Sequence, residues 1–144
     1  MKPYTIIWKD SSFSLYFSGH VSLDDLIAAN NEIIANPRVD SITHYYFDFC
    51  NVHTLELSEK DMQIYTMYDA VMPKFLKRSM IRGAFRVPSS KMKEFWMRFL
   101  DAGHKAWPRK AFISSMIAET WVQDGCAYQK KAHQQSTLIQ HAIA

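Results

Sequence analysis

The sequence predicts an α/β fold: a five-stranded, mostly parallel sheet that begins with a hairpin and carries about four helices, mainly on one face. Three observations lead to this prediction. Strand-like and helix-like segments alternate after an initial pair of strands, which is the order of a parallel sheet with right-handed crossovers. Serines stand where helices would begin. The expected strands alternate polar and apolar residues instead of being apolar throughout.

The chain has 144 residues, of which 48% are hydrophobic and 22% charged, a composition typical of one globular domain with a single core. Its apolar runs are too short for a membrane span, and its first residues do not resemble a signal peptide. Cys50 and Cys126 do not make a disulfide framework. We therefore expect a cytoplasmic protein without a cofactor, in which residues 1–125 form the domain and residues 126–144 an extension.

Five short segments have the composition and alternation of strands: residues 4–9, 13–18, 43–49, 80–87 and 110–113. Their apolar side collects Phe13, Leu15, Phe17, Tyr45, Phe47, Phe49, Ile81, Phe85 and Val87. Their polar side collects Ser14, Tyr16, His44, Tyr46, Asp48, Arg82 and Arg86. Parallel sheets normally bury both faces. A half-polar face therefore predicts that it meets water, the C-terminal extension or the second subunit of a homodimer.

Four segments have apolar residues at helical spacing. The first three follow Ser22, Ser58 and Ser89, and the fourth begins at Ser115. In the first, Asn30 lies within the apolar stripe, either as a core amide bonded to nearby backbone or as an amide that faces a ligand. In the second, Pro73 should break the helix. The stripe of this second helix that we expect to face the core comprises Ile64, Tyr65, Tyr68, Val71, Met72, Phe75 and Leu76.

Asp48 is expected to end the central strand at the carboxyl edge of the sheet, where open α/β sheets bind ligands. Arg86 ends the neighbouring strand and points to the same face by alternation. The two side chains form either a structural ion pair or an anchor for an anionic or polar ligand.

Asp48, Cys50 and His53 also suggest a metal site or a Cys–His nucleophile. Structural zinc requires four ligands, and no third residue is evident that would orient a Cys–His pair. The sequence therefore predicts no metal site and no catalytic centre, so we expect a protein that is not an enzyme.

The charges are unevenly distributed: residues 1–72 contain 4 Lys/Arg against 10 Asp/Glu, and residues 73–110 contain 11 against 2. The simplest explanation is that each charge complements a nearby helix dipole. The alternative is a basic, aromatic edge that contacts an anionic membrane surface. The residues expected to face the membrane are Lys74, Lys77, Arg78, Lys105, Trp107, Arg109 and Lys110. Nucleic acid is not an expected partner, because no reading motif is present and the acidic half would repel it.

The chain from Tyr4 to Trp121 resembles the SpoIIAA-like family, whose STAS fold occurs in anti-anti-sigma factors and is related to that of the CRAL-TRIO lipid-carrier domains. The resemblance lies in the opening strand Tyr-Thr-Ile-Ile-Trp, in the segments 18–32, 36–38, 47–52 and 55–58, and in Ala118 and Trp121.

Two functions follow from this resemblance. The first is a module that binds a small apolar or lipid-like ligand, with peripheral association with the inner face of the membrane. Its ligand-binding residues would be Asp48, Arg86, Tyr65, Tyr68 and Met72. The alternative is a regulatory protein–protein interaction module whose partner contacts the edge around Ser58.

Ser58 corresponds in place to the phosphorylated serine of the anti-anti-sigma factors. The Asp-Ser-Ser motif of that site is absent, and Glu56, Glu59 and Asp61 would repel an added phosphate. The residues alone therefore favour a plain N-cap at Ser58.

Overall fold

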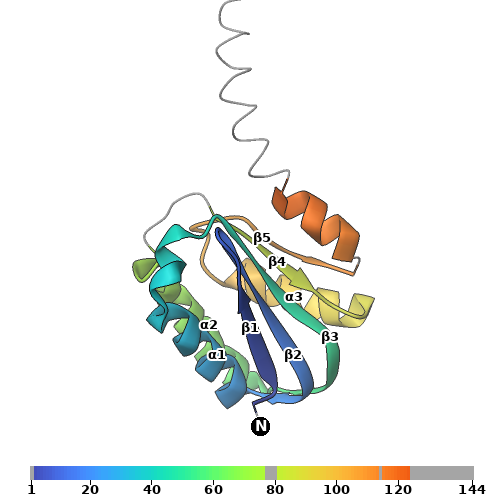
Figure 1. Ribbon diagram of the computed structural model, residues 1–144. Helices are drawn as coiled ribbons and strands as arrows, with labels where there is room; N and C mark the ends of the chain where they lie inside the picture. The colour runs from blue at the N-terminus through green and yellow to red at the C-terminus, as the bar shows by residue number, and fades with distance from the viewer. Residues whose placement is uncertain (1, 77–80, 114, 124–144) are drawn as a thin grey trace, which may run out of the picture.

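The computed structural model describes residues 2–76, 81–113 and 115–123, which contain one five-stranded sheet in the order β1-β2-β3-β4-β5 (Figure 1). The strands are β1 (Tyr4–Trp8), β2 (Ser12–Ser22), β3 (His44–Glu56), β4 (Arg82–Arg86) and β5 (Arg109–Phe112). β1 is antiparallel to β2, and every other neighbouring pair is parallel. The predicted hairpin followed by a parallel sheet is thus confirmed. The extension 126–144 lies outside the described residues.

The α-helices are α1 (Leu23–Ala35), α2 (Glu59–Val71), α3 (Ser90–Ala102) and a further helix over residues 115–123. Two 3₁₀ turns, η1 (Pro37–Ser41) and η2 (Met72–Lys74), follow α1 and α2, the second at the position where Pro73 removes a backbone donor. The three predicted caps are confirmed, because the hydroxyl groups of Ser22, Ser58 and Ser89 accept hydrogen bonds from the backbone three residues on.

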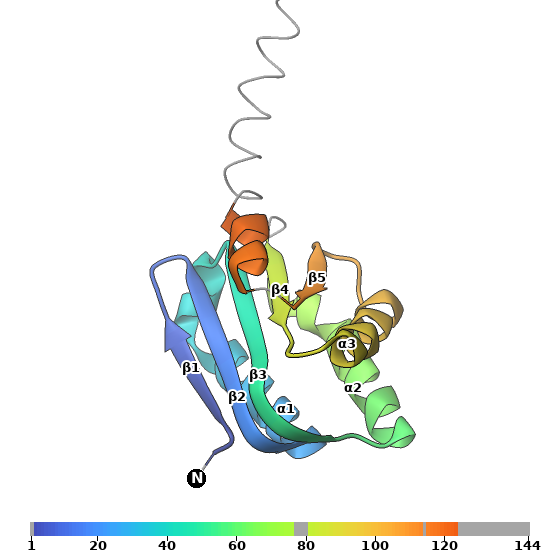
Figure 2. The ribbon, with the colours of Figure 1, turned by 90° about the vertical axis from the view of Figure 1, so that its right-hand side faces the viewer.

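The sheet has an inner face, covered by α1, α2 and α3, and an outer face on its other side (Figure 2). The strand order advances in one direction along the sheet, so right-handed crossovers place all three connecting helices on the same face. Helix 115–123 follows the last strand and is not a crossover, so this constraint does not apply to it. It packs on the outer face.

The inner core is largely aromatic. Trp96 of α3 is fully buried, and its ring lies 4.6 Å from that of Phe49 on β3 and 5.3 Å from that of Phe85 on β4. Phe17 of β2 stacks on Phe49, with 5.0 Å between the ring centres. These contacts join the central strands to α3, and they confirm the apolar side predicted from strand alternation.

The outer face has its own small core beneath helix 115–123. Tyr46, Ala84 and Phe112 of the sheet pack against Ala118 and Val122 of the helix. Two arginines predicted on the polar side hold the helix in place. Arg82 donates to the carbonyl oxygen of Trp121 at 3.1 Å and lies over its ring, and Arg86 pairs with Glu119 at 3.0 Å. The polar face is therefore partly covered by the chain's own last described helix.

The third strand is much longer than the sequence predicts. We expected it to end near Asp48 and to be followed by a turn, whereas β3 continues to Glu56. Its second half pairs with the second half of β2, which runs on through Gly19 to Ser22. Gly19 has a φ of 71°, and the register shifts on both sides of it, so it forms a bulge and does not end the strand. Asp48 consequently lies inside β3, beside the end of β4.

Helix α2 is rotated relative to the orientation that its apolar residues predict. Tyr65 and Leu76 are buried as expected, but Ile64, Val71 and Phe75 are exposed. The expectation for these three is wrong because it counted only apolar residues toward the inward face. The structure instead buries Asp69, one turn after Tyr65, and this turns Ile64 and Val71 toward the surface.

Candidate functional site

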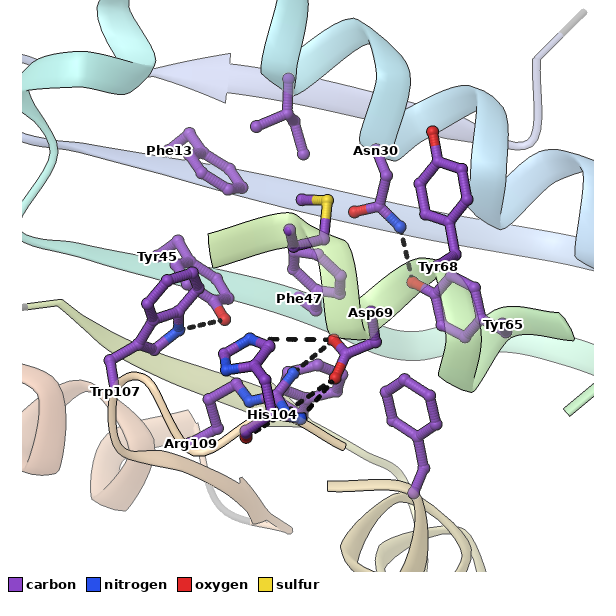
Figure 3. Close-up of a pocket in the computed structure, with 14 residues that line it drawn as sticks. Phe13, Asn30, Tyr45, Phe47, Tyr65, Tyr68, Asp69, His104, Trp107 and Arg109 are labelled. Atoms are coloured by element: carbon purple, nitrogen blue, oxygen red, sulfur yellow. Dashed lines mark hydrogen bonds and ion pairs between the residues drawn. The ribbon is translucent and has the colours of Figure 1, made fainter. Parts of the chain in front are cut away.

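A small cavity of about 30 Å³ lies between α1, α2 and the inner face of the sheet (Figure 3). It is lined by Phe13, Asn30, Ile33, Tyr45, Phe47, Tyr65, Tyr68, Asp69, Met72, Phe85, Phe99, His104, Trp107 and Arg109. Three of the predicted ligand-binding residues, Tyr65, Tyr68 and Met72, are among them. The volume is enough for a water molecule, but it is far below the roughly 300–1,000 Å³ of pockets that enclose a small organic ligand.

A buried ion pair between α2 and β5 forms one wall of this cavity. Both oxygens of Asp69 accept hydrogen bonds from the guanidinium group of Arg109, at 2.6 and 2.9 Å. The backbone amide of His104 donates to Asp69 at 3.1 Å, and Arg109 donates to the carbonyl oxygen of His104 at 2.9 Å. The side chains of Asp69 and Arg109 are only 10% and 4% exposed. A bidentate pair with these further hydrogen bonds is the geometry that a buried salt bridge needs in order to be stable.

Two further hydrogen bonds fix the aromatic walls. Trp107 donates its indole N–H to the hydroxyl of Tyr45 at 3.0 Å, and Asn30 donates to the hydroxyl of Tyr65 at 2.6 Å. Asn30 is therefore a buried amide of the core, bonded to a side chain and not to nearby backbone. Gly83 lies directly against the ring of Tyr45, where a Cβ atom would overlap the ring. The cavity is therefore rigidly built.

His104 is uncharged at neutral pH. Burial and the neighbouring charge of Arg109 lower its pKa from 6.5 to about 4, although Asp69 acts in the opposite direction. Its Nδ1 atom accepts a hydrogen bond from the backbone amide of Ala106 at 3.2 Å. A proton on Nδ1 would break this bond, so the local geometry agrees with the direction of the pKa shift.

Acidification is therefore expected to destabilise the fold through His104. Because its folded pKa lies below its unfolded pKa, the unfolded chain binds the extra proton, and stability falls as the pH drops through the window from 6.5 toward 4. Between about pH 7 and about pH 4.5 the loss due to this residue should be about 2 kcal/mol. In His104→Asn, a side-chain oxygen replaces Nδ1 as acceptor but does not titrate. Urea unfolding at both pH values checks this: an equal pH dependence in the two proteins would contradict it.

Asp48 and Arg86 lie on the outer face, apart from Tyr65, Tyr68 and Met72. Nη1 of Arg86 is 3.7 Å from Asp48, Nη2 is 3.0 Å from Glu119, and the guanidinium lies 4.2 Å from the centre of the Tyr46 ring. The two residues share a face, as strand alternation predicts. The five residues expected to form one ligand site are thus divided between two sides of the sheet, and the sequence could not reveal this division without the orientation of α2.

Cys50 is a poor candidate for a nucleophile. Burial and the adjacent Asp48 raise the pKa of its thiol to about 11, so it is protonated at neutral pH. Its backbone amide donates to Asp48 at 2.9 Å, which gives that carboxylate a structural partner. Within residues 2–76, 81–113 and 115–123, no group of three or more His, Cys, Asp or Glu side chains is arranged to hold a metal ion.

Ser58 caps α2 in a reciprocal capping box with Asp61. The Ser58 hydroxyl accepts from the Asp61 amide at 3.1 Å, and the Asp61 carboxylate accepts from the Ser58 amide at 3.0 Å. Ser58 is exposed at the start of the helix. Its modification stays a prediction, and an added phosphate would face the Asp61 carboxylate at close range.

The residues expected to face a membrane do not form one surface. Lys74, Lys105 and Lys110 are exposed, but the side chains of Trp107 and Arg109 are buried against Tyr45 and Asp69. The expectation of an exposed aromatic and basic anchor at these two positions therefore needs correction, because each has a polar partner inside the fold. Lys77 and Arg78 lie outside the described residues. No helix in the described part of the chain is long and apolar enough to cross a bilayer.

Sequence reasoning missed Asp69 and His104. Asp69 follows Tyr65 by four residues and precedes Met72 by three, so it occupies the inward row of α2. A charged residue in that row is a signal of a buried partner, and the spacing alone would have supported this inference. His104 has no such signal, because it lies in the loop after α3.

The fold has counterparts among solved structures, although no family model and no curated protein matches the chain. The anti-sigma factor antagonist SpoIIAA in its unphosphorylated form superposes with a TM-score of 0.52 at 10% identity, over 83% of this chain and 97% of that one. An anti-sigma factor antagonist from Mycobacterium paratuberculosis gives 0.51 at 19% identity, over 83% and 92%. These superpositions, which cover most of each chain, show that this chain has the SpoIIAA-like, or STAS, fold.

Proposed function

We propose that this chain is a non-enzymatic regulatory module that binds another protein through α2 and the neighbouring surface of α3. The observation that carries the proposal is a row of apolar side chains on the outside of α2. Ile64, Met67 and Val71 are 39%, 72% and 39% exposed, and Phe75 beyond the helix is 53% exposed. Spacings of three and four residues place the first three on one face of the helix. A contiguous exposed apolar row of this kind is characteristic of an interaction surface.

A groove of about 570 Å³ runs beside this row, between α2 and α3. Its lining is mostly apolar and comprises Met62, Met67, Phe95, Phe99 and Ala102, together with Gln63, Thr66, Glu59 and Arg98. Methionine and aromatic side chains adapt well to a protein partner. The occupant that fits best is an amphipathic helix, with its apolar side chains in the groove and an acidic group near Arg98.

The fold comparison supports the same reading. The two solved structures described above are of antagonists of anti-sigma factors, and an antagonist of that kind acts on another protein. Two observations support a non-enzymatic role: Asp69 and Arg109 pair with each other in the interior, and the pKa of the thiol of Cys50, an exposed residue, is raised to about 11. The lipid-like ligand expected at Tyr65, Tyr68 and Met72 is less well supported, since their cavity measures only about 30 Å³.

Site-specific photo-crosslinking in cells tests the proposal. A photoreactive residue at Met67 should give a discrete adduct with a different protein, and the same residue at Ile7 should not. Ile7 is a matched control because it is an exposed apolar side chain, 46% accessible, on β1. Adding Ile64→Glu should abolish the adduct while the circular dichroism spectrum stays unchanged.

Three outcomes would contradict the proposal. Equal adducts from both positions would indicate nonspecific capture, and an adduct containing only this chain would indicate a homodimer. The third outcome is the absence of an adduct at Met67 together with evidence of lipid binding. That evidence would be lipid bound to the purified protein in native mass spectrometry, or flotation with anionic vesicles, and it would favour the ligand and membrane reading instead.

A further inference from the structure

An open cleft of about 420 Å³ lies on the outer face, on the other side of the sheet from the α2 surface. It is lined by Lys9, Asp10, Ser11, Ser12, Ser14, Tyr16, His44, Tyr46, Arg86, Glu119 and Gln123. The cleft is much larger than the interior cavity, and its size falls in the range of pockets for small organic molecules. It takes no part in the function proposed above.

The floor of the cleft follows from strand register. Ser12 pairs with His44 and Ser14 with Tyr46 across β2 and β3, so their side chains stand together on the outer face. The turn between β1 and β2 supplies one end, and helix 115–123 supplies a side wall through Glu119 and Gln123. Three separate parts of the chain thus converge on one concave surface.

Arg86 is held firmly at the wall of the cleft. Its side chain is only 8% exposed, and Asp48, Glu119 and the Tyr46 ring fix its position. Its Nε atom is buried and has no hydrogen-bond partner among the described residues. A buried donor without a partner costs free energy unless a bound molecule or water satisfies it. Arg86 therefore gives the cleft a fixed wall, whereas its unpaired Nε is a feature that it shares with Arg82, which does not line the cleft.

The charges of the lining are balanced, and this argues against an anionic ligand. Lys9 and Arg86 are offset by Asp10 and Glu119, and Asp48 adds a further negative charge behind Arg86. Burial and the charge of Lys9 lower the pKa of His44, which favours its neutral form. A phosphate or carboxylate would have to compete with two carboxylates for Arg86.

The remaining lining groups are rich in hydroxyls. Ser11, Ser12, Ser14 and Tyr16 each carry a hydroxyl that can both donate and accept, and Gln123 contributes an amide. Tyr16, which is only half-buried, also supplies an aromatic ring against which the apolar side of a ligand ring can pack. We propose that this cleft binds a small, uncharged molecule with a hydroxyl-rich ring, of the size of a sugar or a nucleoside.

Titration of the full chain, followed by backbone amide NMR shifts, tests this inference. The probes are glucose, maltose, adenosine and inorganic phosphate. At least one hydroxylated probe should cause saturable shifts at residues 12–16 and 44–46. Shifts with glucose or maltose would identify a free sugar as the source of the ring, and shifts with adenosine alone would identify a nucleoside.

The variants Ser14→Ala and Tyr16→Phe each remove one hydroxyl without altering the carbon framework, and each should weaken binding by about tenfold. Met67→Ala, on the other side of the sheet, should leave the affinity unchanged. The inference is overturned if only phosphate shifts these amides, or if no probe does so at roughly tens of millimolar. It is also overturned if the shifts persist unchanged in both hydroxyl variants.

Discussion

Replacing Asp69 with alanine is expected to lower the free energy of unfolding by about 3–5 kcal/mol, because it leaves Arg109 as an unpaired buried cation. The Arg109 side chain is 4% exposed, and Asp69 provides two of its hydrogen bonds. The backbone amide of His104 would also lose its acceptor. Urea unfolding followed by circular dichroism measures the change, and the midpoint should shift while the slope stays constant.

Two controls isolate the ion pair. Asp101→Ala, at an exposed position of α3, should change stability by no more than about 0.5 kcal/mol. The double variant Asp69→Leu with Arg109→Leu removes both charges and should recover much of the stability that Asp69→Ala loses. If Asp69→Ala costs no more than Asp101→Ala, the pair is not the buried anchor that the geometry describes.

Trp96→Ala should cost about 3–5 kcal/mol through lost burial and the cavity that forms. Trp96 is fully buried, and its ring contacts those of Phe49, Phe85, Phe95 and Phe99. These rings belong to the sheet and to α3 itself, so the neighbouring side chains cannot easily close the space. Differential scanning calorimetry should show a lower melting temperature with a smaller enthalpy.

Trp96→Phe is the matched comparison for this prediction. It also removes the indole N–H, which is buried without a hydrogen-bond partner among the described residues. Burial removes this N–H from water without giving it a hydrogen bond in return. Its removal should therefore offset part of the stability lost with the packing of the larger ring. Trp96→Phe should therefore cost clearly less than Trp96→Ala. Because both variants remove the N–H, an equal loss in the two would contradict the packing account.

The features that local sequence determines were predictable. Ser22, Ser58 and Ser89 cap their helices because a capping hydroxyl needs only a backbone amide three residues away. The inner and outer faces of the sheet follow from the two-residue period of a strand. The common side of α1, α2 and α3 follows from right-handed crossovers once the strand order is known.

The features that depend on distant pairing were not predictable. The second half of β3 looks like a turn because His53 and Thr54 are polar, but its backbone groups pair with β2. Asp69 and Arg109 are separated by 40 residues, so no local pattern links them. Without that link, Ile64 was assigned to the core and Trp107 to the surface, and both assignments were reversed by the fold.

In the candidate sites, too, local patterns were predictable from the sequence and contacts between distant segments were not. The expectation that Asp48 and Arg86 share a face required only strand alternation, and the structure shows it. Helix 115–123 was expected, but its position on the outer face was not, because a helix after the last strand has no crossover rule to place it. Glu119 and Gln123 therefore could not be connected with the cleft from the sequence.

The unequal pairing of β3 divides that strand into two regions of different local stability. Residues 44–48 lie between β2 and β4, whereas residues 51–56 have β2 as their only strand partner within the described parts of the chain, because β1 and β4 do not extend that far. Amide protons of the second region should exchange with solvent through partial opening, and those of the first only through global unfolding. Opening of residues 51–56 away from β2 is thus expected to leave the five-stranded centre intact, because residues 44–48 stay paired with β4.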